Sequence, residues 1–157
     1  MRYLRSFGEF IKEGVVKKVR KDRERAKNLM LESERKLHSL NENLEKIGVK
    51  DSNANDYVEY CYDILLHLVR ARLYSRGYSG SGQGAHEAEV SYARNLGFTE
   101  REVRFLDQLR YFRNGILYYG TRLDKEYAEK VIEFTMKNYP RLRKLLITLT
   151  KALTIVF

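Results

Sequence analysis

Apolar side chains recur at alternating spacings of four and three residues along most of this chain, which is the period of one face of an α-helix. The longest such run has its apolar and small residues at Ala26, Met30, Ser33, Leu37, Leu40, Leu44 and Ile47. Asp22 precedes the run and is placed to accept the free amide hydrogens of a first turn, and Gly48 follows it as a terminator. The pattern predicts one long helix between these two residues.

The same spacing predicts three more long helices. The second follows the polar connector KDSNAND and runs to about Ser75, with apolar positions at Tyr57, Cys61, Ile64, Leu68 and Ala71. The third opens at Thr99, which has the spacing of a capping box with Glu102, and continues along Leu106, Leu109 and Ile116. The fourth begins at Asp124 and follows Tyr127, Val131 and Phe134, and Pro140 kinks or restarts it.

Shorter elements lie around these helices. A first short helix is expected over about residues 3–12, followed by an extended connection at Val15, Val16 and Val19. The segment RGYSGSGQGAHEAEV lacks the Lys-Ser/Thr ending of a phosphate-binding loop, so we interpret it as a mobile connector. A short helix near residues 85–95 follows it. Because few segments alternate apolar and polar residues, the fold class is predicted to be all-α.

The length of the chain fits one domain over residues 1–157, which can bury a core without disulfides or metal. We expect one bundle of four or five main helices packed as antiparallel neighbours, with residues 1–20 as an N-terminal extension and residues 139–157 as a basic, apolar C-terminal helix. The net charge of +9 is concentrated in residues 17–25 and 141–151. This charge favours an anionic partner such as RNA, a nucleotide or an acidic protein, although a solubilising role accounts for it equally well.

The single cysteine, Cys61, lies among apolar residues and is expected to be buried. No run approaches the roughly 18 apolar residues of a membrane span, and no N-terminal segment has the pattern of a signal peptide. No two His or Cys residues have the spacing of a metal site. We therefore expect a soluble, cytoplasmic protein with no membrane contact, no metal and no cofactor.

The stretch LRYFRNGILYYG, at the end of the third long helix, contains the candidate site. Arg113 falls on the apolar stripe of that helix and needs a partner, because a desolvated guanidinium is costly without one. That partner is either a structural tie, to carbonyls of a helix end or to a carboxylate such as Asp63 or Asp107, or the phosphate of a ligand. Tyr118 lies about 140° further round an ideal helix. Gly120 allows the last residues to unwind and fold back, which predicts a polar pocket at the helix end.

The ordered set formed by ARLYSRGYSGSGQGAHEAEVSYARNLGFTEREV and LDQLRYFRNGILYYG resembles the HEPN superfamily, the higher eukaryotes and prokaryotes nucleotide-binding domains, and in particular its compact archaeal members. The resemblance covers about residues 10–146. It implies an antiparallel four-helix core with extra short helices and a homodimer with clefts at the seam. It also implies either a metal-independent ribonuclease or a toxin–antitoxin partner of a minimal nucleotidyltransferase, where a tyrosine near the motif receives nucleotidyl groups.

Carried over residue by residue, Arg113 and Asn114 match the RN pair of the family motif. Tyr118 occupies the position where many members have the histidine of the ribonuclease site, and Tyr119 lies beside it. Tyrosine has a pKa near 10, so about one molecule in a thousand is ionised at pH 7, and it is a poor base for cleavage through a ribose hydroxyl. The resemblance therefore implies Arg113, Asn114, Tyr118 and Tyr119 as ligand-binding residues and puts efficient cleavage in doubt.

The three histidines have different expected roles. His38 lies off the helical stripe and is expected to be exposed, whereas His67 lies between leucines and is expected to be structural. His86 follows the glycine-rich segment at the start of a helix, and it is a candidate catalytic residue with Arg113 and Tyr118.

Three functions remain open at this point. The first is a non-catalytic or weakly catalytic HEPN-like module that binds a nucleotide, RNA or a partner nucleotidyltransferase. The second is a ribonuclease toxin in which His86 or a tyrosine replaces the missing histidine, and the third is a helical protein-interaction module. We prefer the first. A homodimer is expected because Phe105, Phe112 and Leu117 point away from the apolar stripe of their helix and need another surface to cover them.

Overall fold

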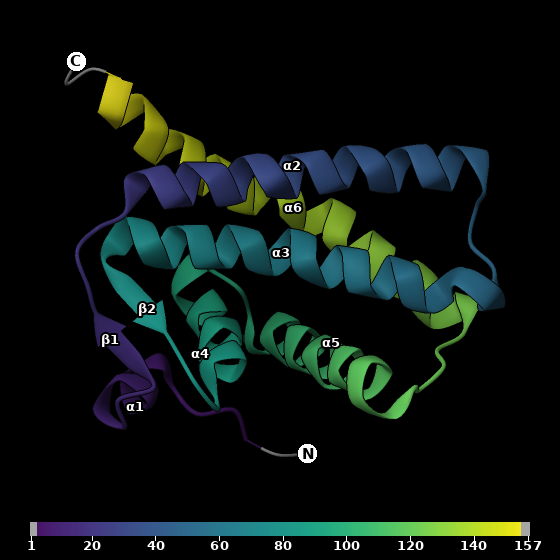
Figure 1. The fold of residues 1–157 in the computed structure, drawn as a ribbon, viewed down its shortest axis with the longest axis horizontal. Helices are drawn as coiled ribbons and strands as arrows, with labels where there is room; N and C mark the ends of the chain where they lie inside the picture. The colour runs from purple at the N-terminus through teal and green to yellow at the C-terminus, as the bar shows by residue number, and fades with distance from the viewer. Residues whose placement is uncertain (1–2, 155–157) are drawn as a thin grey trace.

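The computed structural model describes the backbone of residues 3–154 and the side chains of residues 3–147, so Lys151, the last basic residue of 141–151, has its side chain outside the described part. Within that part the fold is mostly helical, with one small antiparallel sheet (Figure 1). The helices are α1 (Phe7–Lys12), α2 (Arg23–Lys46), α3 (Ala54–Arg76), α4 (Ala85–Tyr92), α5 (Glu100–Tyr119) and α6 (Lys125–Thr154). Two short 3₁₀ helices, η1 (Asp51–Asn53) and η2 (Ala93–Leu96), and the strands β1 (Val16–Lys18) and β2 (Tyr78–Gly80) complete the fold.

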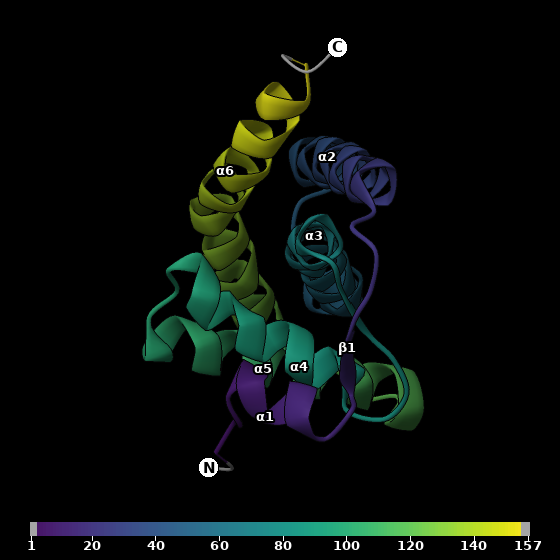
Figure 2. The ribbon, with the colours of Figure 1, turned by 90° about the vertical axis from the view of Figure 1, so that its left-hand side faces the viewer.

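Helix α3 lies at the centre of the molecule. Helices α2 and α6 pack along it, and α4 and α5 contact it from another side (Figure 2). Fourteen of its 23 residues are buried, as expected for a helix that others pack against on more than one side. Cys61 is one of them, fully buried as predicted, and burial raises the pKa of its thiol to about 12.

Side-chain caps confirm three of the predicted helix starts. The Oδ1 atoms of Asp22 and Asp124 each accept a hydrogen bond from the backbone N–H three residues on, at 2.9 and 2.8 Å. Thr99 and Glu102 form the capping box of α5 in both directions. Each cap satisfies amide hydrogens that a helix leaves free in its first turn, which is why these residues mark the starts so clearly.

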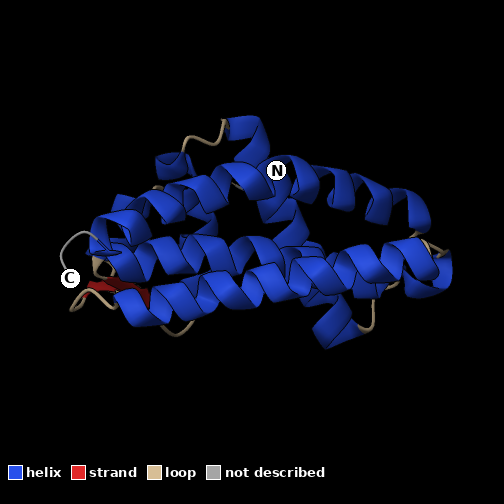
Figure 3. Cartoon of the chain, turned by 90° about the horizontal axis from the view of Figure 1, so that it is seen from above, coloured by secondary structure: helices blue, strands red, loops and turns tan. Residues whose placement is uncertain are grey.

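The glycine-rich segment differs from the prediction, because its first residues pair as β2 with β1. Val16 lies opposite Gly80, and the side chain of Val16 is buried in the core. The sheet lies at one end of the long helices (Figure 3). Interpreting residues 78–80 as a connector without regular structure is therefore wrong, since a pairing between segments so far apart in sequence leaves no trace in helical periodicity.

Helices α1 and α6 also differ from the prediction. Helix α1 begins at Phe7 rather than at residue 3, because Ser6 and Glu9 form a capping box there. Helix α6 continues through Pro140 and does not restart. Tyr139 and Leu142, on either side of the proline, are buried, so packing holds both halves of the helix against the core despite the missing N–H donor.

Gly77 ends α3 in the left-handed conformation, with φ of 81°, and a Cβ there would lie 2.8 Å from the carbonyl oxygen of Val19. We expect Gly77→Ala to lower the free energy of unfolding by about 2 kcal/mol, because the left-handed conformation costs about 1–2 kcal/mol and the backbone must also shift. Gly14→Ala is the matched control, since its φ is 79° and nothing lies within 4 Å of its Cβ. Chemical denaturation measures both losses, and equal losses would contradict the steric part of the prediction.

Candidate functional site

Arg113 projects from α5 toward α3. Its guanidinium carbon lies 5.2 Å from the centre of the Tyr62 ring, and its Nη2 lies 3.9 Å from Oδ1 of Asp63. Of the two carboxylates considered as structural partners, Asp63 is therefore the one that Arg113 approaches. Asp107 instead accepts a hydrogen bond from Nε of Arg110 at 2.8 Å.

The distance between Arg113 and Asp63 is long for an ion pair, and Asp63 also contacts Lys36. Nζ of Lys36, on α2, donates a hydrogen bond to Asp63 at 2.9 Å. Nε of Arg113 is buried and has no hydrogen-bond partner among the described residues, while 23% of the side chain is exposed. Arg113 is thus a partly desolvated cation whose hydrogen-bonding capacity is largely unused inside the protein.

Two further titratable groups of α3 lie near these charges. Burial raises the pKa of the Glu59 carboxyl, and the charge of Arg113 offsets part of that rise. Burial lowers the pKa of His67, the charge of Asp63 opposes this shift, and Nδ1 of His67 is buried without a hydrogen-bond partner in the described part of the chain. We call Lys36, Glu59, Tyr62, Asp63, His67 and Arg113 the Arg113 cluster.

The end of α5 corrects one expectation. The helix stays α-helical to Tyr119, and Gly120 then takes the left-handed conformation, with φ of 63°. Tyr118 is 75% exposed and Tyr119 87% exposed. The last residues therefore do not unwind to bring Tyr118 beside Arg113, because the backbone of Gly120 and of Thr121 closes the helix by donating to carbonyls of its last turns. Asn114, next to Arg113, is half-buried.

His86 belongs to a different group of side chains. It lies in the first turn of α4, its side chain is half exposed, and its Nδ1 is 3.8 Å from Oε1 of Glu89. Glu89 is buried and forms an ion pair with Arg70 of α3 at 2.8 Å. Among the residues with described side chains, no hydrogen bond, ion pair or ring contact joins His86 to Arg113. The structure brings Arg113 to α3 without bringing either Tyr118 or His86 into contact with it.

Helix α6 covers two of the three residues on which the dimer expectation rests. The ring centres of Phe105 and Phe134 are 4.4 Å apart, and those of Phe112 and Tyr127 are 5.1 Å apart. Leu117 is 48% exposed. The exposed apolar and aromatic residues of α5 are instead gathered in its second half and are Tyr111, Leu117, Tyr118 and Tyr119.

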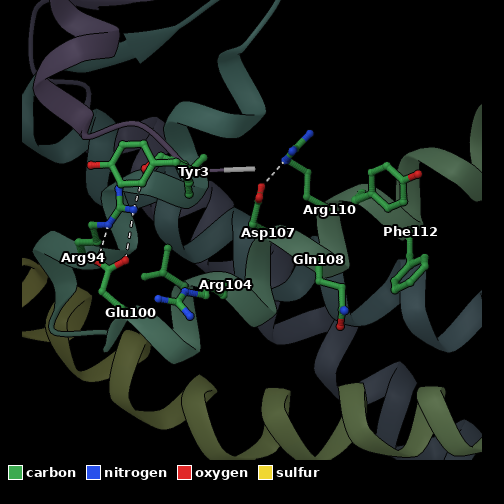
Figure 4. A pocket seen from close by; sticks show the side chains of 11 residues that line it. Tyr3, Arg94, Glu100, Arg104, Asp107, Gln108, Arg110 and Phe112 are labelled. Carbon is green, nitrogen blue, oxygen red and sulfur yellow. Dashed lines mark hydrogen bonds and ion pairs between the residues drawn. The ribbon is translucent and has the colours of Figure 1, made fainter. Parts of the chain in front are cut away.

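A hollow of about 730 Å³ lies between the N-terminal segment, η2 and the first three turns of α5 (Figure 4). Its charged lining residues are Arg94, Glu100, Arg104, Asp107 and Arg110. The pattern of residues along the chain does not predict this hollow, because its walls come from three separate segments. The available signal is the spacing of Glu100, Arg104 and Asp107, which places three charged side chains of the lining on one side of α5.

The partners of Arg113 on α3 also had a signal in the sequence. Glu59, Asp63 and His67 follow each other at spacings of four in the largely buried helix α3, which puts three ionisable groups on one face. The helical spacing points to Asp63 as a possible partner but does not point to Glu59, Tyr62 or Lys36. Only the packing of α2 and α5 on α3 shows that they meet.

No family model, curated protein or solved structure matches this chain. Within the described residues, no helix combines the length and the apolar character that crossing a lipid bilayer requires. In the same part of the chain, no three His, Cys, Asp or Glu side chains are grouped so that they could hold a metal ion.

Proposed function

We propose that this chain is a HEPN-like nucleotide- or RNA-binding module of the cytoplasm, built on an antiparallel four-helix core and active as a homodimer. It acts with a minimal nucleotidyltransferase or a similar partner and has no catalytic activity or only a weak one. The observation that carries this proposal is Arg113, a partly buried arginine with unused donors next to an aromatic ring.

An anionic ligand suits Arg113 better than its present contact does. Charge-assisted hydrogen bonds to an oxyanion are short, whereas Arg113 and Asp63 are 3.9 Å apart and Asp63 is already bound by Lys36. A phosphate at the exposed side of the guanidinium would use donors that the fold leaves unpaired. The net charge of +9 favours the approach of such a ligand.

Binding is favoured over cleavage because no suitable base lies beside Arg113. Tyr118 is exposed on another side of α5, and His86 contacts Glu89. His67 is close to Asp63, but burial disfavours its charged form, which the transfer of a proton from a ribose hydroxyl would create. The ribonuclease alternative therefore has less support than the binding module.

The homodimer rests on the exposed end of α5. Tyr111 and Tyr118 are seven residues apart and share one side of the helix, and Leu117 and Tyr119 are exposed beside them. Such a group of apolar and aromatic side chains is typical of a protein interface. It also supports the alternative of a helical protein-interaction module, in which the second protein is a different chain.

The test compares binding and cleavage in one sample. We expect the wild-type protein, in the presence of a chelator, to sediment as a dimer, to bind a labelled RNA and a mononucleotide, and to leave the RNA intact. Tyr118→His should also leave it intact, because the new imidazole would lie about 140° round α5 from Arg113. Cleavage that Tyr118→His raises and that a second change, Arg113→Gln, abolishes would instead favour the ribonuclease. If the wild-type protein binds neither the RNA nor the mononucleotide, the proposed function is contradicted.

A further inference from the structure

We propose that the outer face of the first three turns of α5 is a second binding surface, separate from the Arg113 cluster, and that it takes a single strand of nucleic acid across Arg104. The assignment of the ligand as nucleic acid rests on the proposed function, whereas the existence of the surface rests on its own geometry. We call it the Arg104 surface.

Two hollows meet at this place. The hollow of about 730 Å³ lies on one side of Arg104, and a second one of about 720 Å³ lies on the other side, between α5 and α6. Arg104 and Gln108 line both hollows. The two hollows are therefore adjacent, with Arg104 and Gln108 at their shared wall, and this arrangement suits an extended chain better than a compact ligand held in one pocket.

The carboxylates of the two hollows are already neutralised. Glu100 pairs with Arg94 at 2.6 Å, Glu102 pairs with Arg141 at 3.2 Å, and Asp107 pairs with Arg110 at 2.8 Å; these pairs account for all the lining residues that carry a negative charge.

Three lining cations remain, namely Arg101, Arg104 and Lys137. Within the part of the chain whose side chains are described, they make no hydrogen bond and no ion pair, and all three are exposed. Figure 4 shows Arg104 without a bonded partner, beside the bonded Arg94 and Glu100. Three positive charges in excess on one face form an electrostatic site for a polyanion with several phosphates.

Aromatic rings accompany the cations. Tyr3 and Tyr111 line the first hollow and are 75% and 69% exposed, so their faces are accessible for stacking. Phe105 and Phe134 contribute to the wall of the second. Arg101 and Tyr111 are ten residues apart, which is about 15 Å along the helix axis. Alternation of accessible rings with cations is the arrangement by which proteins bind single strands without reading their sequence. An acidic peptide would use the cations but would gain little from the rings.

The Arg104 surface and the Arg113 cluster are distinct. Arg113 projects toward Tyr62 and Asp63 of α3, whereas Arg104 is exposed and lines hollows formed with η2 and α6. A ligand at one of them therefore makes its contacts with different side chains from a ligand at the other, and the two sites can be tested separately.

The experiment measures fluorescence anisotropy of a labelled oligouridylate of about ten nucleotides, a length within the range of known single-strand sites. We expect Arg104→Ala to weaken binding several-fold and Arg104→Ala with Lys137→Ala to weaken it further. The slope of log K against log salt should become shallower by about 0.7 for each phosphate contact that is lost. Arg35→Ala, which removes the same charge from the exposed face of α2, should leave both quantities unchanged, and circular dichroism checks that each variant is folded.

Four results would overturn the inference. The first is that the wild type does not bind oligouridylate, and the second is that changes at Arg104 and Lys137 leave its affinity unaffected. The third is that Arg35→Ala weakens oligouridylate binding as much as Arg104→Ala does. The fourth is that an oligoglutamate of the same length binds equally tightly and in an Arg104-dependent way. The proposed function is judged on different data, namely the binding of uridine monophosphate by wild type and by Arg113→Gln. Loss of oligouridylate binding in Arg113→Gln but not in Arg104→Ala would contradict the Arg104 surface.

Discussion

Glu89→Ala is expected to lower the free energy of unfolding by about 3 kcal/mol, because it leaves the guanidinium of Arg70 without its carboxylate in a largely buried place. Glu89 is 5% exposed and accepts a hydrogen bond from Nε of Arg70 at 3.0 Å. The pair joins α4 to α3. The expected loss lies at the lower end of the range for broken buried pairs, since 26% of the Arg70 side chain is exposed. Urea denaturation followed by circular dichroism measures it.

Two control variants separate the causes of this loss. His86→Ala removes the imidazole that lies 3.8 Å from Glu89 and is half exposed, and it should change the stability by less than about 0.5 kcal/mol. Glu89→Leu combined with Arg70→Met removes both charges and should recover most of the stability, because apolar side chains of similar volume avoid the desolvation cost. If Glu89→Ala unfolds at the same urea concentration as the wild type, the pair does not hold α4 in place.

Much of the fold is predictable from the sequence because its signals are local. The side chains of Asp22 and Thr99 accept hydrogen bonds from the backbone amides three residues on, so four consecutive residues suffice to predict where each helix begins. The apolar stripe of α2 likewise extends over adjacent turns of one helix. Burial of Cys61 is predictable because its neighbours in the sequence are apolar, and the prediction does not depend on knowing which helices pack against α3.

What the sequence did not reveal depends on contacts between distant segments. Pairing of Val16 with Gly80 depends on how α2 and α3 return the chain, so that residues 78–80 lie beside β1. The position of Tyr118 was misjudged for a related reason. A glycine at the end of a helix permits unwinding but does not require it, and hydrogen bonds to the last turn of α5 keep the helix intact.

The candidate site likewise combines a feature that local spacing predicts with contacts that only the packing of distant segments creates. That Arg113 lies on the apolar side of α5 follows from helical spacing alone, and the structure places it against α3 accordingly. That Asp63 is shared with Lys36, and that Nε of Arg113 has no partner among the described residues, depends on how three helices pack. Those two facts bear on whether Arg113 is a structural tie or a ligand contact, and the order of residues along the chain does not contain them.

Arg113→Gln is expected to weaken the binding of a mononucleotide by about tenfold to a hundredfold, since hydrogen bonds to charged groups contribute about 1.5–3 kcal/mol. The stability should change by less than about 1 kcal/mol, because Asp63 keeps its ion pair with Lys36. Isothermal titration calorimetry and urea denaturation measure the two quantities on the same preparation. Titration followed by NMR gives a third, since the pKa of Glu59 should rise further once the positive charge that lowers it is gone.

Asp63→Asn is the companion variant, with an effect of opposite sign. It removes the carboxylate that competes for Arg113 and leaves the guanidinium in place, so binding of the mononucleotide should become tighter than in the wild type. Lys36 loses its partner in this variant, but its charge then adds to the attraction for an anion. If Asp63→Asn weakens binding as much as Arg113→Gln does, or if Arg113→Gln unfolds the protein while the folded fraction binds normally, Arg113 serves to join α5 to α3 and the ligand binds elsewhere.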